Sequence, residues 1–431
     1  MSPETIGIIG VIALIAMIAC RVWIGASLAV VGFFGIVAIS GWNTAMGVVV
    51  TAPFAQLDNY ITTAIPMFTL MGMIIAGTDI GKNLFDFANK LLGRRPGGVA
   101  SATIAASGLM GAITGSDNVA CVIMSKLALP ELKRFRYADS IAGAAVAAGA
   151  PLAILIPPSM AFIMYAMLTE QSVGKLFMAG IMPGVIMIIA FVVAITIACK
   201  ANPSLGPKGE HYSRGEKLKS LKGVLPVVIL FLLVLGSIYM GICTATEAGA
   251  IGALGAFVIA LITRDMSFAR FRQILIESVL AVAFVLYLLV GTFIFIKFVT
   301  ISKLTFLITN FILGLNVSTG AVILMIAVMY VILGMLIPQI PMMILTVPLI
   351  VPAMMALGID IIWFGVFVVM MMALGAISPP IGMDVFIVSG LSKIPVTTIY
   401  RGVLPFIVAD IVVIILCCLF PVIVLWLPGM M

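Results

Sequence analysis

Charged residues are scarce in this chain of 431 residues, where Asp, Glu, Lys and Arg together account for 9% and hydrophobic residues for 63%. The mean hydropathy is +1.32. Soluble globular domains usually have about a quarter of their residues charged. The scarcity of charge therefore excludes a soluble fold and predicts an all-α polytopic membrane protein.

Histidine is nearly absent as well, because His211 is the only one and it lies in the most polar loop. The six cysteines are scattered through apolar segments, without the spacing or the His partners of a metal site. No His pair, Ser-Lys motif or acidic pair stands where a membrane-embedded enzyme would need it. We therefore predict that the protein is not an enzyme, and we interpret the net charge of +7 as a topology signal rather than a nucleic-acid site.

Long apolar segments dominate what is present. Segments of roughly 17 to 25 apolar residues are long enough to cross a bilayer as helices. We predict crossings at 5–20, 22–40, 62–79, 138–168, 176–199, 223–242, 246–263, 277–300, 361–391 and 401–423. Two further apolar regions, 97–129 and 317–357, break sharply near their centres and are interpreted as re-entrant hairpins. The amphipathic segment 80–93 is expected to lie along the membrane interface as an arm.

Glycine and proline mark an internal repeat with an interval of 222 positions. The first set is Gly143, Pro157, Pro158, Gly180 and Pro183, and the second is Gly365, Pro379, Pro380, Gly402 and Pro405. Both residue types are unfavourable in helix interiors. Their recurrence at one interval inside apolar stretches therefore indicates two copies of one interrupted-helix unit, a pattern typical of transporters.

The basic residues predict that this repeat is inverted. With the N-terminus outside, all of them except Lys175, Lys297 and Lys303 fall in cytoplasmic segments. The polar loop 200–222 is then a cytoplasmic linker between halves 1–199 and 223–431, each with five crossings and one hairpin. Because five is odd, the second half enters the membrane from the opposite side. Each half begins with scaffold helices, at 1–79 and 223–300, and continues through its hairpin to a broken helix at 138–168 or 361–391.

The first hairpin breaks at GAITGSDNVA, positions 111–120. This cluster exposes backbone carbonyl, hydroxyl and carboxylate oxygens, which are the ligands of small hard cations. Asp117 is costly at membrane depth unless it is paired with a cation or well solvated. The broken helix of the same half contains GAPLAILIPPSM, positions 149–160. Pro151 is expected to free carbonyls around 147–149, and Pro157 and Pro158 add a second disruption.

The second half offers the hairpin tip GMLIPQIPMMIL (334–345) and the broken-helix motif GAISPPIGMDVF (375–386). Gln339 and Ser378 supply polar side chains, while Gly375, Ala376 and Pro379 supply exposed carbonyls. Asp384 is the intramembrane acid of this region. It is interpreted as a cation ligand, a substrate contact or a buried structural residue.

At these motifs the chain resembles the large membrane subunit of the tripartite ATP-independent periplasmic (TRAP) transporters. The resemblance covers essentially the whole chain, through AIPMFTLMG (64–72), GSDNVA (115–120), the run 149–183, TATEAGA (244–250), LGIDIIWFG (357–365) and GAISPPIGMDVF (375–386). It implies a multi-pass protein of the bacterial inner membrane that imports an organic anion, generally a carboxylate. It also implies a sodium-driven elevator mechanism like that of the wider ion transporter superfamily, in which the hairpins and broken helices move against the scaffold.

The resemblance further implies partners and sites. The partners are a small four-helix membrane subunit and a periplasmic substrate-binding protein, and the only cofactor is Na⁺ as the coupling ion. One sodium site would use Gly115, Ser116, Asn118 and Gly149. The other would use Gly334, Pro338, Gln339, Gly375 and Ser378. The substrate would lie between the hairpin tips, in the region of Asp117, Pro157, Pro158, Ser159, Pro379, Pro380, Gly382 and Asp384.

Two positions depart from the family pattern. Many members carry an Asp where this chain has Pro338, and a Ser-rich first tip where it has Asp117. The ligands of the second sodium site and the ion that it binds are therefore left open by the sequence. A different function also remains open, that of a stand-alone sodium–dicarboxylate symporter without a binding protein.

Overall fold

The computed structural model describes residues 1–263, 266–315 and 317–431, and over these residues the all-α fold is confirmed. An isolated bridge between Pro96 and Lys208 is the one β pairing in this part of the chain. Arg264, one of the basic residues predicted to be cytoplasmic, lies outside the described residues.

The first half contains α1 (Pro3–Ala19), α2 (Ile24–Ser40), α3 (Trp42–Leu57), η1 (Tyr60–Thr63), α4 (Ala64–Ala76), α5 (Ile80–Leu92), α6 (Gly98–Thr114), α7 (Asp117–Arg134), α8 (Asp139–Gly149), α9 (Leu152–Leu155), α10 (Met160–Thr169) and α11 (Val173–Ala201). The second contains α12 (Arg214–Tyr239), α13 (Ala245–Ile262), α14 (Phe268–Ile301), α15 (Leu304–Gly314), α16 (Thr319–Leu336), α17 (Gln339–Ala356), α18 (Ile361–Ile377), α19 (Met383–Ser392), α20 (Val396–Leu419), α21 (Val422–Leu425) and η2 (Pro428–Met430).

The helix boundaries follow the same interval as the glycine and proline residues. Helix α17 begins and ends 222 positions after α7, and α18 covers the residues 222 positions after the segment Asp139–Leu155. The Pro157–Pro158 and Pro379–Pro380 peptide bonds are both cis. The repeat therefore extends from single residues to whole helices, while its inverted orientation in the membrane stays a prediction.

Two helices were not predicted from the sequence. Helix α3 is less apolar than its neighbours and contains Pro53, so its residues did not form a clear crossing. It joins η1 and α4 at a bend of 52°, and the pair together qualifies as one broken span. Helix α15 has 11 residues, too few to cross a bilayer, and occupies the place in the second half that α5 occupies in the first.

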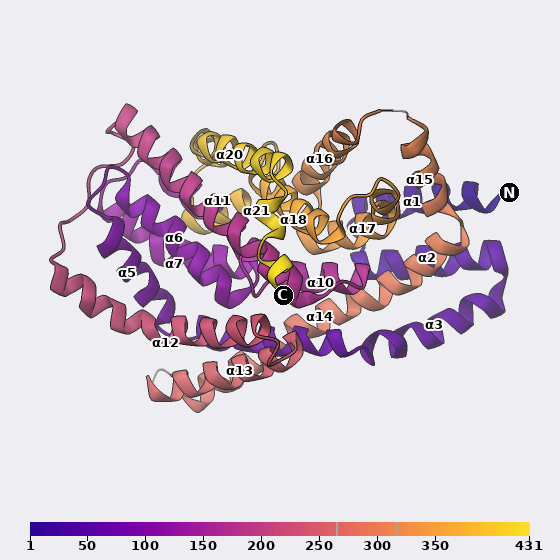
Figure 1. Cartoon of the computed structure of the whole chain (residues 1–431), viewed down its shortest axis with the longest axis horizontal. Coiled ribbons are helices and arrows are strands. Elements are labelled where there is room, and N and C mark those ends of the chain that lie inside the picture. The colour runs from indigo at the N-terminus through magenta and orange to yellow at the C-terminus, as the bar shows by residue number, and fades with distance from the viewer. Residues whose placement is uncertain (264–265, 316) are drawn as a thin grey trace.

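Within the described residues, seven helices are long and apolar enough to cross a membrane, or nine when each bent pair counts as one span. The seven include α16 and α17, which by length and composition could each cross the membrane, whereas the sequence predicts that they form a re-entrant hairpin. Figure 1 shows the α6–α7 hairpin on the left and α17 on the right, with α18 between them. The re-entrant interpretation of α16–α17 therefore depends on where their tip lies, which is described with the site below.

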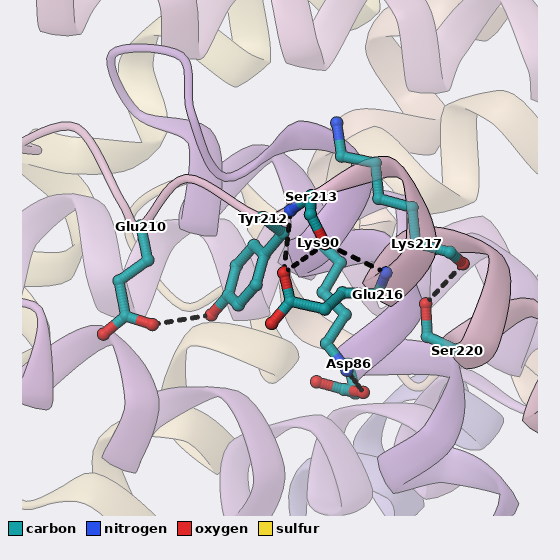
Figure 2. A network of polar contacts seen from close by, with 8 residues as sticks. All are labelled: Asp86, Lys90, Glu210, Tyr212, Ser213, Glu216, Lys217 and Ser220. Carbon is teal, nitrogen blue, oxygen red and sulfur yellow. Dashed lines mark hydrogen bonds and ion pairs between the residues drawn. The ribbon is translucent and has the colours of Figure 1, made fainter.

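The segment predicted as a linker, 200–222, is partly helical because α12 begins at Arg214. Ser213 and Glu216 form a capping box there, in which the Glu216 carboxylate accepts a hydrogen bond from the Ser213 backbone N–H at 2.7 Å. Figure 2 shows this cap beside the Lys90–Asp86 ion pair of α5, whose N–O distance is 2.6 Å. Lys90 also lies 5.9 Å from the ring centre of Tyr212.

Residues 202–213, which we call the strap, cross the base of the first hairpin. The backbone N–H of Gly209 donates to the Gly93 carbonyl at 2.9 Å, and that of Ala138 donates to the Leu205 carbonyl at 3.0 Å. The Tyr137 hydroxyl donates to the Pro207 carbonyl at 2.9 Å and accepts from the Val99 N–H at 3.1 Å. Burial raises the pKa of Tyr137 to about 12, so its hydroxyl keeps the proton that it donates. The strap is therefore held against the hairpin base rather than free of it.

The variant Tyr137→Phe is expected to loosen the strap. It removes the donor to Pro207 and leaves the buried Val99 N–H without its acceptor, a loss of about 1 to 3 kcal/mol. Limited trypsin digestion should then cleave at Lys208 roughly tenfold faster, because cleavage follows the population of the open strap.

The matched control is Tyr212→Phe. The Tyr212 hydroxyl donates only to Glu210, at 3.0 Å, and both residues belong to the strap. Its removal should leave the cleavage rate unchanged. Equal rates for wild type and Tyr137→Phe would mean that the Tyr137 hydroxyl does not hold the strap.

Candidate functional site

A cavity of about 280 Å³ lies where the tips of the two hairpins meet. The first tip contributes Thr114 to Val119 and the second contributes Pro338 to Pro341. The remaining wall consists of Ile24, Thr69, Gly72, Met73, Ile154, Met160, Ala161, Ala281, Phe284 and Val285. Both tips therefore line one cavity, where Asn118 is exposed and Gln339 is buried, and the re-entrant interpretation of the two hairpins stays a prediction.

The first tip turns at Gly115, whose φ of +60° is in the left-handed region. A β-carbon added there would come within 2.8 Å of the Pro158 carbonyl oxygen. The Met160 N–H in turn donates to the Gly115 carbonyl at 3.2 Å. The tip is thus joined to the break between α9 and α10, and Ser116, Asp117 and Asn118 line the cavity beside it.

The second tip is held by a direct backbone contact. A β-carbon added to Gly375 would lie 2.8 Å from the α-carbon of Gly334, so α16 and α18 touch at these two glycines. Pro338 and Gln339 line the cavity at the start of α17. The Gln339 side chain is 7% exposed, and neither its amide nitrogen nor its amide oxygen has a hydrogen-bond partner within the described part of the chain.

Gly149 is not brought to the first tip. A β-carbon there would meet the Ser107 hydroxyl at 2.6 Å, and Ser107 precedes Gly115 by eight residues, or about 12 Å along α6. The helix also continues in one direction through Pro151, since Asp139–Leu155 acts as one rod that bends by 41° before Met160. The main break of this helix is therefore at 156–159, the second of the two disruptions expected from the sequence.

Ser159 closes that break. Its hydroxyl donates to the Ile154 carbonyl at 2.5 Å and accepts from the Phe162 N–H at 3.4 Å, so it joins the end of α9 to the start of α10. Pro157, Pro158 and Ser159 are buried but do not line the cavity. Ser159 is therefore a capping residue in the structure, and the substrate contact that the family resemblance implies for it stays a prediction.

In the second broken helix, Ser378, Pro379, Pro380 and Gly382 do not line the cavity either. The Ser378 hydroxyl donates to the Leu374 carbonyl at 2.7 Å, at the end of α18. Pro379 and Pro380 are exposed, and Gly382, with a φ of +31°, lies over the last carbonyls of α18. Whether Ser378 contributes to a sodium site stays a prediction.

Asp384 lies in the first turn of α19 and is fully buried, and both of its carboxylate oxygens lack a hydrogen-bond partner among the described residues. Helix α19 packs against α7, and the Cys121 thiol approaches the Asp384 carbonyl at 3.8 Å. Asp117, on the first turn of α7, is close enough to Asp384 for the two carboxylates to interact electrostatically. No group of three or more His, Cys, Asp or Glu side chains able to hold a metal occurs in the described ranges.

Sequence reasoning missed the wall supplied by the scaffold. Thr69, Gly72 and Met73 come from α4, and Ala281, Phe284 and Val285 come from α14. The α4 residues overlap the AIPMFTLMG motif, which was available as a signal. The α14 residues are part of a uniformly apolar crossing, where no local pattern separates a cavity wall from a lipid-facing side chain.

A second cavity of about 380 Å³ adjoins the first and shares Met73, Asn118 and Val119 with it. It lies between α4, α7 and α14, and Glu277 is part of its wall. The Glu277 carboxylate accepts a hydrogen bond from the Gln273 amide at 2.9 Å. The two cavities therefore lie side by side between the first hairpin and helices α4 and α14.

Comparison with known proteins is consistent with this architecture. The chain is 31% identical to the sialic acid TRAP transporter large permease protein SiaM of Vibrio cholerae, over 86% of this chain and 87% of that one. It is 30% identical to the C4-dicarboxylate TRAP transporter large permease protein DctM of Pseudomonas aeruginosa, over 87% of this chain and 88% of the relative.

A third relative is the isethionate TRAP transporter permease protein DctMQ of Oleidesulfovibrio alaskensis, 30% identical over 87% of this chain and 59% of the longer relative. The crystal structure of the YdaH transporter of Alcanivorax borkumensis has the same fold, with a TM-score of 0.62 and 14% identity over 88% of this chain and 89% of that one. Residues 11–423 match the family described as the DctM component of the tripartite ATP-independent periplasmic transporters. The chain therefore belongs to the DctM component family of the TRAP transporters.

Proposed function

We propose that this chain uses sodium ions to drive the import of an organic anion of the carboxylate class, which a periplasmic binding protein delivers to it. Family membership supports the coarser part of this function. The chain is a multi-pass inner-membrane protein and a transport permease, like its relatives. The sodium coupling and the substrate class are the parts that go beyond the family.

The observation that carries the proposal is the cavity between the two hairpin tips. A transporter needs one site that both sides of the membrane reach in turn, and a site bounded by two hairpins allows one gate for each side. Ser116 and Asn118 offer side-chain oxygens at one tip, and Gln339 offers an unpartnered amide oxygen at the other. Oxygen donors of this kind suit Na⁺, which would be held at each tip as a co-substrate.

The proposed movement is an elevator. The hairpins and broken helices would move as one body against the scaffold that includes α4 and α14. The boundary between these bodies coincides with the cavity, because its wall combines hairpin residues such as Asn118 with scaffold residues such as Phe284. Movement along this boundary would carry the substrate from one side to the other.

The proposed partners are a small membrane subunit and the binding protein. The fused DctMQ relative supports the first, since this chain spans 59% of its length. Sialic acid, a C4-dicarboxylate and isethionate appear in the names of relatives, so the substrate of this chain does not follow from family membership.

The test is uptake into liposomes that contain this chain. Import is expected only when an inward sodium gradient, the small subunit and the substrate-loaded binding protein are all present. A potassium gradient of equal size is the control for sodium. Rapid uptake of free substrate by this chain alone would refute the tripartite function and favour a stand-alone symporter.

A further inference from the structure

The charge of the cavity wall bears on the substrate. Among the residues that line the cavity between the tips, Asp117 is the only charged one, and Glu277 is the only charged residue of the adjoining cavity. No Lys, Arg or His lines either cavity in the described residues. Cavity walls whose charged residues are all carboxylates raise the local concentration of cationic groups and lower that of anions. A simple dicarboxylate would therefore meet a repulsive wall.

Asp117 also lacks a basic partner. Its side chain is 9% exposed, and the ion pairs of the described residues join Lys90 to Asp86 and Arg134 to Glu131 and Glu210, away from the cavity. Asp384, fully buried in the first turn of α19, which packs against α7, has no hydrogen-bond partner for its carboxylate oxygens among the described residues. Buried carboxylates without a counter-charge are costly. The sodium ion proposed at Ser116 and Asn118 would offset part of this cost, and a positive charge on a bound molecule would lower it further.

The second hairpin tip is suited to bind a negatively charged group. Helix α17 has 18 residues and begins at the cavity, and its cap residue Pro338 makes no side-chain hydrogen bond to the first backbone amides. The N–H groups available there are those of Gln339 and Ile340, because Pro341 has none and the Met342 N–H donates to the Pro338 carbonyl. The N–H groups of a helix N-terminus, together with the helix dipole, bind carboxylates. The Gln339 side chain, buried and without a partner in the described part of the chain, offers a further N–H donor there. These two features point to a carboxylate at the second tip.

We propose that the substrate is a small zwitterion, whose cationic nitrogen lies against Asp117 at the first tip and whose carboxylate lies against Gln339 and the N-terminus of α17 at the second. The inference rests on the proposed function, because it assigns the substrate of the same site; it keeps the carboxylate of the proposed organic anion and adds a cationic nitrogen, so that the net charge is zero. The Phe284 ring and the aliphatic wall of the cavity suit a methylated or cyclic nitrogen better than a primary ammonium, since apolar groups around the charge can pack there. A volume of about 280 Å³ is near the lower end for ligand pockets and fits a small molecule.

The test compares two probes of the same shape. Glycine betaine has a trimethylammonium group, and tert-butylacetate has a tert-butyl group in its place, so only the positive charge differs. Binding to the purified full chain in sodium buffer is measured as the rise in melting temperature with probe concentration, and succinate serves as a dicarboxylate. Glycine betaine is expected to bind at least tenfold more tightly than either anion, a difference of about 1.4 kcal/mol.

Variants then assign the two ends of the ligand. Asp117→Asn should bring glycine betaine and tert-butylacetate to equal affinity, whereas Asp117→Glu should keep a preference. Gln339→Ala should weaken both probes alike, because both have the carboxylate. Asp79→Asn, the same change at an exposed position of the chain, is the control and should behave as wild type. If Asp117→Asn does not fold, the preference of the wild type decides alone.

Equal or tighter binding of tert-butylacetate or succinate to the wild type would overturn the inference, and so would the absence of binding by glycine betaine. A preference that persists in Asp117→Asn would overturn the role of Asp117. These measurements need no gradient or partner. If sodium-driven import fails, the binding results with glycine betaine still hold. If sodium-driven import of a dicarboxylate is observed, the proposed function is supported and the zwitterion proposal is rejected.

Discussion

The variant Gly375→Ala is expected to lose at least nine-tenths of its uptake, a tenfold effect that corresponds to about 1.4 kcal/mol. The added β-carbon would lie 2.8 Å from the α-carbon of Gly334, a distance that real β-carbons do not occupy. The neighbour is backbone, so no side chain is able to swing aside. Helix α16 must therefore move away from α18, and the second tip moves with it.

The matched control is Gly320→Ala. Gly320 belongs to the same helix as Gly334, but nothing lies within 4 Å of a β-carbon built there. Its uptake and melting temperature should equal those of the wild type, or rise slightly because alanine favours helix. Gly375→Ala is expected to lower the melting temperature too, since overpacking costs about 1 to 3 kcal/mol. Wild-type uptake by Gly375→Ala would show that close contact between the second hairpin and α18 is not needed for transport.

The second prediction with a large expected effect concerns the sodium concentration that gives half-maximal uptake. Alanine at Asn118 or Ser116 removes a side-chain oxygen from the first tip, where both residues line the cavity. Loss of one such donor should raise the sodium concentration for half-maximal uptake roughly tenfold, which corresponds to about 1.4 kcal/mol of binding free energy. The maximal rate at saturating sodium should fall much less, because the fold and the second tip are retained.

Ser125→Ala provides the control for this experiment. Ser125 lies on the same helix α7, outside the cavity wall, and its buried hydroxyl has no hydrogen-bond partner in the part of the chain that the structure describes. Its sodium requirement should match that of the wild type. If Asn118→Ala and Ser116→Ala also keep the wild-type requirement at unchanged expression, the first sodium site is not at this tip.

The departures of this chain from the family pattern fall at the cavity. Asp117 and Pro338, singled out as unusual in the sequence, come from different hairpins and line the same wall. Pro338 precedes the first turn of α17 and contributes no side-chain donor or acceptor to it. Gln339 is therefore the residue of the second tip whose polar side chain would bind sodium or substrate in the proposed function.

Much of the fold was predictable because the bilayer constrains the backbone locally. Every crossing must satisfy its own hydrogen bonds over a known length, so long apolar segments indicate helices directly. The amphipathic arm was recognised from its own pattern and corresponds to α5. The errors arose where local signals were weak: α3 contains Pro53 and several polar residues, α15 is short, and α12 extends into a segment whose charges resembled a loop.

The site was predictable only in part. Gly115, Ser116, Asp117, Asn118, Pro338 and Gln339 were identified from the sequence because breaks in helices are made by residues with unusual backbone or polar side chains. The structure places Gly115, Ser116, Asp117 and Asn118 in one wall with Pro338 and Gln339. The family resemblance assigned Gly149 to the first sodium site, but Gly149 lies beside Ser107 instead.

The sequence by itself determined that this protein is a helical membrane transporter of the TRAP type with two interrupted-helix units, since apolar length, glycine, proline and motif residues are all properties of short segments. Only the tertiary structure decided which residues meet. Phe284 of the scaffold reaches the cavity, Asp384 of α19 packs against α7 beside Cys121, and the strap lies across the hairpin base. These relations depend on how helices distant in the chain pack against each other, and close packing between helices leaves no mark in the periodicity of any one of them.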